Sequence, residues 1–308
     1  MLPGWIAFTL SAALFQTWRT ALQQRLRGQL SVNAAAVVRY LYGVPVGIAL
    51  VLAYLAVFGG EVHAPGAIVL LLCAAGGLTQ ILGTNLLIMA FGYRNFAVGT
   101  AYSKTEAVQA ALIASLLLGE HLSALSWAGI AVSLGGVLVL SLAGKGTHPA
   151  ELLRGITQPA ALCGIGSGLC FALTAILIRE ANRALPGPDP VFRALLILVI
   201  TNTLQTLMQG GWLLLREPAQ LRAVFASWRS SAPVGALSAL GSACWFSAFA
   251  LAPVALVRAV GQTEILFTLA FGRFYLAEKA TRADIAGALL LVGGVVLVLV
   301  GALAATSS

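Results

Sequence analysis

The chain has 308 residues, of which 59% are hydrophobic and only 9% charged, and its formal net charge is +8. Because a soluble domain carries about 25% charged residues, this composition excludes an ordinary soluble protein and indicates an integral membrane protein. The positive charge does not indicate nucleic-acid binding, since Lys and Arg are scattered singly at segment ends and form no basic run.

Ten apolar segments follow one another along the chain, each about 20 residues long, the length that spans a bilayer as a helix. Their approximate bounds are 4–24, 34–58, 66–91, 95–119, 123–143, 156–180, 190–214, 231–252, 254–277 and 282–303. Backbone polar groups in lipid must be hydrogen-bonded within their own segment, which favours helices. We therefore predict an all-α membrane protein with ten transmembrane helices.

Two stretches match each other without a gap at a spacing of 158 residues. One is YSKTEAVQAALIASLLLGE around Glu106, and the other is AVGQTEILFTLAFGRFYLAE around Glu264. The match continues with Thr105 and Thr263, Glu120 and Glu278, Gly129 and Gly287, and the pairs Gly135–Gly136 and Gly293–Gly294. It divides the chain into two five-helix repeats, residues 1–148 and 149–308. An odd number of spans in each repeat predicts inverted repeats.

Loop charges give an orientation. If both termini were cytoplasmic, the inside loops would carry three Arg residues and the outside loops ten Lys or Arg residues. Since basic residues concentrate in cytoplasmic loops, this distribution predicts that both termini are outside the cytoplasm.

Glu106 and Glu264 are the strongest candidates for function, because each lies near the middle of an apolar span. A carboxylate in hydrocarbon is costly and usually marks a functional site. Desolvation favours the neutral form, so such a group can bind and release protons near neutral pH. The functional interpretation is a proton or substrate-amine site. The structural alternative is a glutamate held by a partner such as Lys104, Arg19 or Arg258.

Further candidates follow from helical spacing. Tyr102 shares a stripe with Glu106, and Arg258 and Gln262 occupy the positions equivalent to Thr100 and Lys104. A cavity lined by Lys104 and Arg258 near the two glutamates suits an anion or a substrate with both charges. The alternative is two internal salt bridges that bind nothing. Arg19 either faces this cavity or extends to the headgroups.

Other polar residues favour structural roles. Arg39 and Tyr40 near the start of the second span are typical of interfacial anchors. Thr84, Asn85, Asn202 and Gln205 either line a cavity or, more commonly, bond between helices. Glu120 and Glu278, with Ser123 and Thr281, are expected to stabilise the starts of the following helices. The glycine pairs allow close helix packing, and a homodimer through such small-residue faces is one expected assembly. Cysteines and histidines form no metal pattern, and no cofactor motif is present.

The element LLLGEHLSALSWAGIAVSLGGVLVL, repeated as YLAEKATRADIAGALLLVGGVVLVL, resembles the drug/metabolite transporter superfamily, and within it the EamA-type ten-helix metabolite exporters. The resemblance implies inner-membrane export of small metabolites, amino acids above all, often driven by protons. In that family an apolar residue or Pro often stands where this chain has Glu106 and Glu264.

We therefore expect a proton-coupled secondary transporter with alternating access around a mid-membrane site. Its expected partners are a small-molecule substrate, protons and the lipid bilayer. One alternative is exchange of anionic metabolites or sugar phosphates. From another class, a membrane enzyme or an assembly subunit are further alternatives, but an enzyme needs clustered nucleophile and base residues, which the sequence lacks.

Overall fold

Helices make up the regular structure of the computed structural model, which describes residues 3–26, 29–90, 102–119, 122–142, 157–275 and 282–306. Within these described residues, six stretches are long and apolar enough to cross a membrane: Val32–Phe58, Ala67–Ala90, Pro159–Ala184, Pro190–Arg216, Trp228–Leu251 and Ile285–Ala302. Two shorter apolar helices are Glu106–Leu118 and Ala124–Leu140. The predicted all-α class is confirmed, while the number of ten spans stays a prediction.

The chain forms two compact units, and each combines segments from both predicted repeats. Unit 1 contains Met1–Asn85 and Thr174–Ala252, and unit 2 contains Leu86–Leu173 and Pro253–Ser308. The helices with most of their length in unit 1 are α1 (Gly4–Leu26), α2 (Val32–Leu41), α3 (Gly43–Phe58), α4 (Ala67–Ala90), α10 (Pro190–Arg216), α11 (Pro218–Ala226) and α12 (Trp228–Leu251). Those of unit 2 are α6 (Glu106–Leu118), α7 (Ala124–Leu142), α13 (Val254–Gly261), α14 (Glu264–Tyr275) and α15 (Arg282–Thr306), and α9 (Pro159–Ala184) contributes to both.

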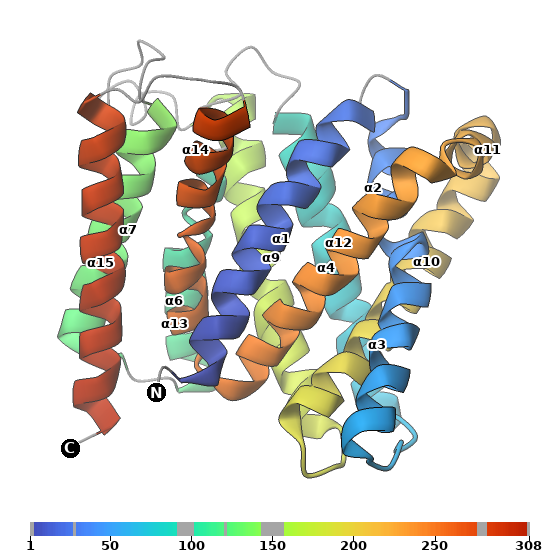
Figure 1. The fold of residues 1–308 in the computed structure, drawn as a ribbon, viewed down its shortest axis with the longest axis horizontal. Helices are drawn as coiled ribbons and strands as arrows, with labels where there is room; N and C mark the ends of the chain where they lie inside the picture. Colours follow the sequence, from blue (N-terminus) through green and yellow to red (C-terminus); the bar gives the residue numbers. More distant parts are fainter. Residues whose placement is uncertain are drawn as a thin grey trace. The chain divides into compact units, whose positions relative to one another are not determined.

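In unit 1, α12 packs along α1 and also contacts α2, α3 and α10 (Figure 1). Apolar side chains fill this contact, among them the fully buried Val37, Leu213 and Val234. Ser31 caps α2 by accepting a hydrogen bond from the amide of Ala34, and its hydroxyl donates to Glu217. The short helix α11 lies in a stretch that the sequence pattern treats only as a connection between spans.

Polar residues inside unit 1 bond between helices, as the sequence suggests for Asn85 and Gln205. Asn85 Nδ2 donates to Asn33 Oδ1 at 3.0 Å, and Gln205 Nε2 donates to the carbonyl oxygen of Gly77 at 3.1 Å. Arg39 and Tyr40 do not have the exposed position that we expected for interfacial anchors, because both are buried, 6% and 2% exposed. The reason is tertiary: α10 and α12 pack against α2 and cover it.

In unit 2, α7 and α15 pack together through glycines at repeat-equivalent positions. A Cβ atom built on Gly129 would lie 2.6 Å from the carbonyl oxygen of Gly294, and one on Gly136 would lie 2.7 Å from that of Gly287. Only glycine permits such backbone approach. Because the earlier residue of α7 meets the later residue of α15, the two helices run antiparallel. This is the direction that inverted repeats require.

Each glycine pair has one member in this contact, Gly136 or Gly294, since no described residue lies within 4 Å of a Cβ built on Gly135 or Gly293. Ser123 caps α7 as expected, because its Oγ accepts from the amide of Ser126 at 3.1 Å. Glu120, Glu278 and Thr281 lie outside the described residues.

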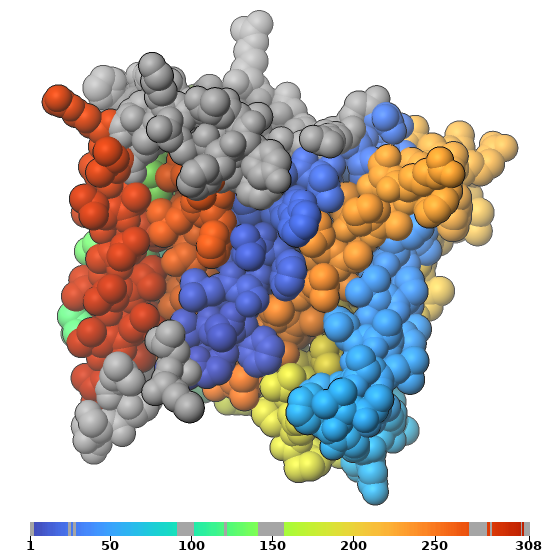
Figure 2. All heavy atoms as spheres, in the orientation of Figure 1, coloured from blue at the N-terminus to red at the C-terminus, as the bar shows by residue number. Residues whose placement is uncertain are grey.

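The outward faces of α3 and α15 remain apolar, and both helices are visible in light blue and red in Figure 2. Leu52 and Phe58 of α3 are 61% and 73% exposed, and Leu289 of α15 is 69% exposed. Large exposed apolar side chains of this kind are expected where a helix faces lipid rather than water.

Candidate substrate and proton site

Both spans that carry the central glutamates contain a break in the helix just before the glutamate. Residues 104–105 form a turn before α6, and residues 262–263 form a turn between α13 and α14. Glu106 is consequently the first residue of α6, and Glu264 is the first residue of α14. The positive end of each helix dipole favours a carboxylate at this position.

The two breaks have the same hydrogen bonds. Thr105 N and Thr263 N each bond to the carbonyl oxygen three residues earlier, that of Tyr102 and that of Val260, both at 3.1 Å. The threonine hydroxyls donate to the same two carbonyls, at 2.6 Å and 2.8 Å. A bond to the third preceding residue tightens the helix into a 3₁₀ turn and, with the threonine hydroxyl, satisfies backbone groups that the break would leave unbonded.

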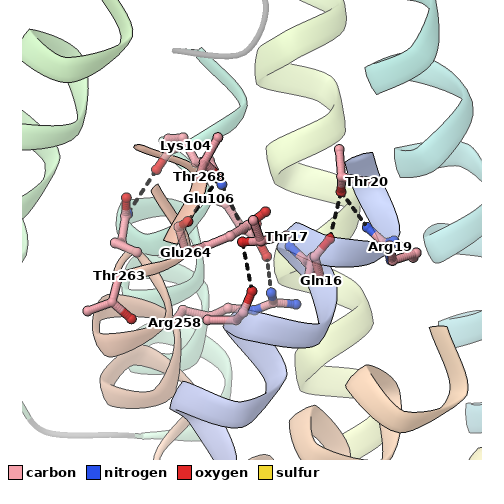
Figure 3. A network of polar contacts seen from close by, with 12 residues as sticks. Gln16, Thr17, Arg19, Thr20, Lys104, Glu106, Arg258, Thr263, Glu264 and Thr268 are labelled. Carbon is pink, nitrogen blue, oxygen red and sulfur yellow. Dashed lines mark hydrogen bonds and ion pairs between the residues drawn. The ribbon is translucent and has the colours of Figure 1, made fainter. Parts of the chain in front are cut away.

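Two ion pairs cross between the repeats at these breaks (Figure 3). Lys104 Nζ lies 2.9 Å from Glu264 Oε2, and Arg258 Nη1 lies 2.7 Å from Glu106 Oε1. The cation of each pair comes from one repeat and the carboxylate from the other. The side chains are 13–21% exposed, so the charges are largely withdrawn from solvent.

The pairs are held by the surrounding backbone. Gln262 Nε2 donates to the carbonyl oxygen of Lys104 at 3.1 Å, and Arg258 Nη2 donates to that of Phe171 at 3.2 Å. α9 comes close to the first break through Gly168, where an added Cβ would lie 3.0 Å from the carbonyl oxygen of Ser103. The site is therefore built by α6, α13, α14 and the part of α9 in unit 2.

Ion pairs of this kind add little to stability, but the loss of one partner destabilises the protein. Desolvation of two charges offsets much of their attraction, whereas removing one partner leaves the other buried without compensation. Protonating a glutamate has the same electrostatic effect as removing its charge. The protonation state of each carboxylate is therefore coupled to whether its cation stays bound.

The structure brings together five of the seven predicted site residues in unit 2: Lys104, Glu106, Arg258, Gln262 and Glu264. Tyr102 is 7% exposed and packs on Ala161, with its carbonyl at the first break. Arg19 belongs to α1 of unit 1, where its Nη2 donates to Thr20 Oγ1 at 3.5 Å. Its membership of the site stays a prediction.

The sequence pattern does not predict the two helix breaks or the hydrogen bond that the backbone carbonyl group of Phe171 on α9 accepts. The threonines at equivalent positions, Thr105 and Thr263, are the one signal in the sequence that coincides with the breaks. Among the described residues, no group of three or more His, Cys, Asp or Glu could hold a metal ion.

Comparison with known proteins identifies the family. The profile described as the EamA-like transporter family matches the chain twice, over residues 3–142 and 158–300. No curated protein matches. A solved structure described only as "Crystal structure of protein" has a similar fold, with a TM-score of 0.73, 18% sequence identity and 98% of each chain covered.

The family match covers most of the chain in two repeats, so this protein belongs to the EamA-like transporter family. It is a multi-pass membrane protein with the two-repeat architecture of that family. Because this is a family of transporters, the match argues against the alternative of a membrane enzyme.

Proposed function

We propose that the protein is a secondary active transporter of the inner membrane that exports small polar metabolites, amino acids above all, and couples their movement to protons. The observation that carries the proposal is the pair of ion pairs, Lys104–Glu264 and Arg258–Glu106, at equivalent helix breaks. Discontinuous membrane helices whose ends meet at a charged site are typical of transporters built from repeats.

The proposed mechanism uses the coupling between protonation and pairing. When a proton neutralises Glu264, Lys104 loses its counter-charge, and the tie between the two repeats at that break is weakened. The same holds for Glu106 and Arg258. At least one of these glutamates therefore exchanges a proton as access to the mid-membrane site alternates between the two sides.

The test is flux through the purified chain reconstituted in liposomes without other proteins. Radiolabelled amino acids are supplied one at a time, and a pH gradient is imposed across the membrane. We expect at least one of them to accumulate against its concentration gradient, and accumulation to stop when an ionophore collapses the pH gradient. Accumulation that is unaffected by the ionophore would contradict proton coupling.

A second candidate, exchange of anionic metabolites, is favoured by Arg39, a buried cation for which the described residues provide no ion pair. In the same liposomes, exchange requires substrate on both sides and no pH gradient. Uptake that depends on trapped internal substrate and ignores the pH gradient would select exchange over proton coupling.

A further inference from the structure

Among the described residues, a buried arginine of unit 1 donates hydrogen bonds only to hydroxyl groups, and its guanidinium carbon lies 5.6 Å from the centre of the neighbouring Tyr40 ring. Arg39 of α2 is 6% exposed; its Nε donates to Ser238 Oγ at 3.2 Å and its Nη1 to Thr84 Oγ1 at 2.7 Å. Both acceptors are buried, 5% and 4% exposed. A guanidinium group has more N–H donors than these two bonds use, and it remains charged in proteins.

The acidic residues of unit 1 lie near helix ends and have other roles where the structure records their bonds. Glu180 pairs with Arg183, Asp189 caps α10, and Glu217 accepts from Ser31. Glu61 is exposed in the connection between α3 and α4. In unit 2, Glu106 and Glu264 already hold Arg258 and Lys104. Within the described part of the chain, Arg39 thus has no carboxylate partner. Because a buried charge without a counter-charge is costly, an arginine in this position is a functional candidate.

Further neutral polar groups of unit 1 follow Arg39 and its partner Thr84 directly in the sequence, or bond to residues that do. Next to Thr84, Asn85 donates to Asn33 and accepts from Gln209 Nε2 at 3.4 Å. Tyr40 Oη and Gln209 Oε1 are buried and have no hydrogen-bond partner within the described part of the chain. Buried polar atoms that stay unpaired within the protein require another partner. Unit 1 therefore holds a buried positive charge together with buried polar atoms that the described residues leave without a partner.

We propose that Arg39, with Thr84 and Ser238, binds the carboxylate of the transported metabolite; this inference rests on the proposed function. The planar guanidinium group matches a carboxylate geometrically and can bond it with two parallel N–H groups. A single positive charge balances a monoanion, whereas a phosphate dianion would retain an uncompensated charge. Lys104 and Arg258 are less suited to this role, because each already holds a carboxylate of the protein.

Binding measurements on the purified chain in detergent test this assignment without requiring transport. The probes are the standard α-amino acids, and the α-amide of each one that binds, which keeps the side chain and removes the carboxylate. We expect the wild-type chain to bind the acid about tenfold or more tightly than the amide, as a charged hydrogen bond implies. Arg39→Gln should reduce this ratio to about one while leaving the affinity for the amide within about twofold.

Unchanged amide affinity shows that the variant is folded, so the loss can be assigned to the carboxylate. If Arg39→Gln does not fold, Ser238→Ala and Thr84→Val should each lower the acid-to-amide ratio instead. Arg183→Gln is the matched control, because it removes an arginine at an exposed ion pair. It should leave the ratio unchanged.

Three results would overturn the inference: a wild-type ratio in Arg39→Gln, no binding of any amino acid to the wild-type chain, or tighter binding of phosphoethanolamine than of the amino acids. Failure of the proposed function looks different. In that case the acid-to-amide ratio still depends on Arg39, but no proton-driven accumulation occurs in liposomes.

Discussion

Gln262 donates a hydrogen bond from Nε2 to the carbonyl oxygen of Lys104 at 3.1 Å, and these two residues occupy equivalent positions 158 residues apart. One repeat thus uses its side chain at this position to hold the backbone of the other. Lys104 in turn holds Glu264 of the second repeat. The two repeats thus differ at this position: Gln262 is neutral and bonds to the backbone of the other repeat, whereas Lys104 is charged and forms an ion pair with it.

Removing one partner of the Arg258–Glu106 pair should lower the free energy of unfolding, whereas replacing both partners together should change it little. Arg258→Met leaves the Glu106 carboxylate buried without its cation, and we expect a loss of about 3–5 kcal/mol in unfolding free energy. The double variant Arg258→Met, Glu106→Leu removes both charges and should recover most of that loss. Thermal unfolding in detergent micelles measures both. A double variant no more stable than the single one would contradict this account of the pair.

Close packing of α7 on α15 can be tested with adjacent glycines. A Cβ on Gly136 would lie 2.4 Å from the backbone nitrogen of Leu291, so Gly136→Ala should separate the helices and cost about 1–3 kcal/mol. Gly135→Ala is the control, because nothing lies within 4 Å of its Cβ. It should gain up to about 1 kcal/mol from helix propensity. Equal effects of the two changes on the unfolding midpoint would count against the packing described.

The capping residue Asp189 should make the stability of the protein depend on pH in the acid range. Burial opposes its ionisation, but hydrogen bonds from Tyr54 and from the amides of Phe192 and Val191, together with Arg193, outweigh it and lower the pKa of Asp189 below 3.8. A lowered pKa means that the stabilisation is fully present well above pH 3.8 and is lost as the pH falls below it toward the folded-state pKa.

Asp189→Asn keeps the capping oxygen but cannot titrate. The difference in unfolding midpoint between wild type and Asp189→Asn should therefore shrink between pH 6 and about pH 3. Asp189→Ala, which also removes the cap, should cost about 1 kcal/mol at neutral pH. A difference that stays constant over this pH range would show that Asp189 does not carry the effect.

Orientation can be decided with fusions to the C-terminal residue, Ser308. The loop charges predict that this end is outside the cytoplasm. Alkaline phosphatase fused there should be active and a fluorescent protein dark. The opposite pattern, bright fluorescence without phosphatase activity, would mean cytoplasmic termini.

Much of the site could be predicted from the sequence because its chemistry is repeated. Two glutamates at matching depths in apolar spans identify Glu106 and Glu264, and the nearby cations Lys104 and Arg258 provide their partners. Which cation pairs with which glutamate could not be predicted. Assigning stripes assumed continuous helices, whereas the turns at 104–105 and 262–263 change the direction of the side chains.

The role of Arg39 could not be predicted for a different reason. Its place near the start of an apolar segment is typical of an interfacial anchor. The neighbouring residues in the sequence give no indication that Arg39 is buried. Its burial results from the packing of α10 and α12 on α2, and its bond partners, Thr84 and Ser238, are distant in sequence. Tertiary contacts of this kind have no periodic pattern in the sequence.

Proton coupling through the central glutamates is the main claim, and the most direct measurement is pH-driven accumulation in liposomes by Glu106→Gln and Glu264→Gln. Gln keeps the shape of the side chain but cannot titrate. We expect at least one variant to lose accumulation by about tenfold or more while still exchanging internal for external substrate. The control Glu180→Gln, at a partly exposed ion pair in unit 1, should behave as wild type. Wild-type accumulation by both Glu106→Gln and Glu264→Gln would contradict the account and place the coupling group elsewhere.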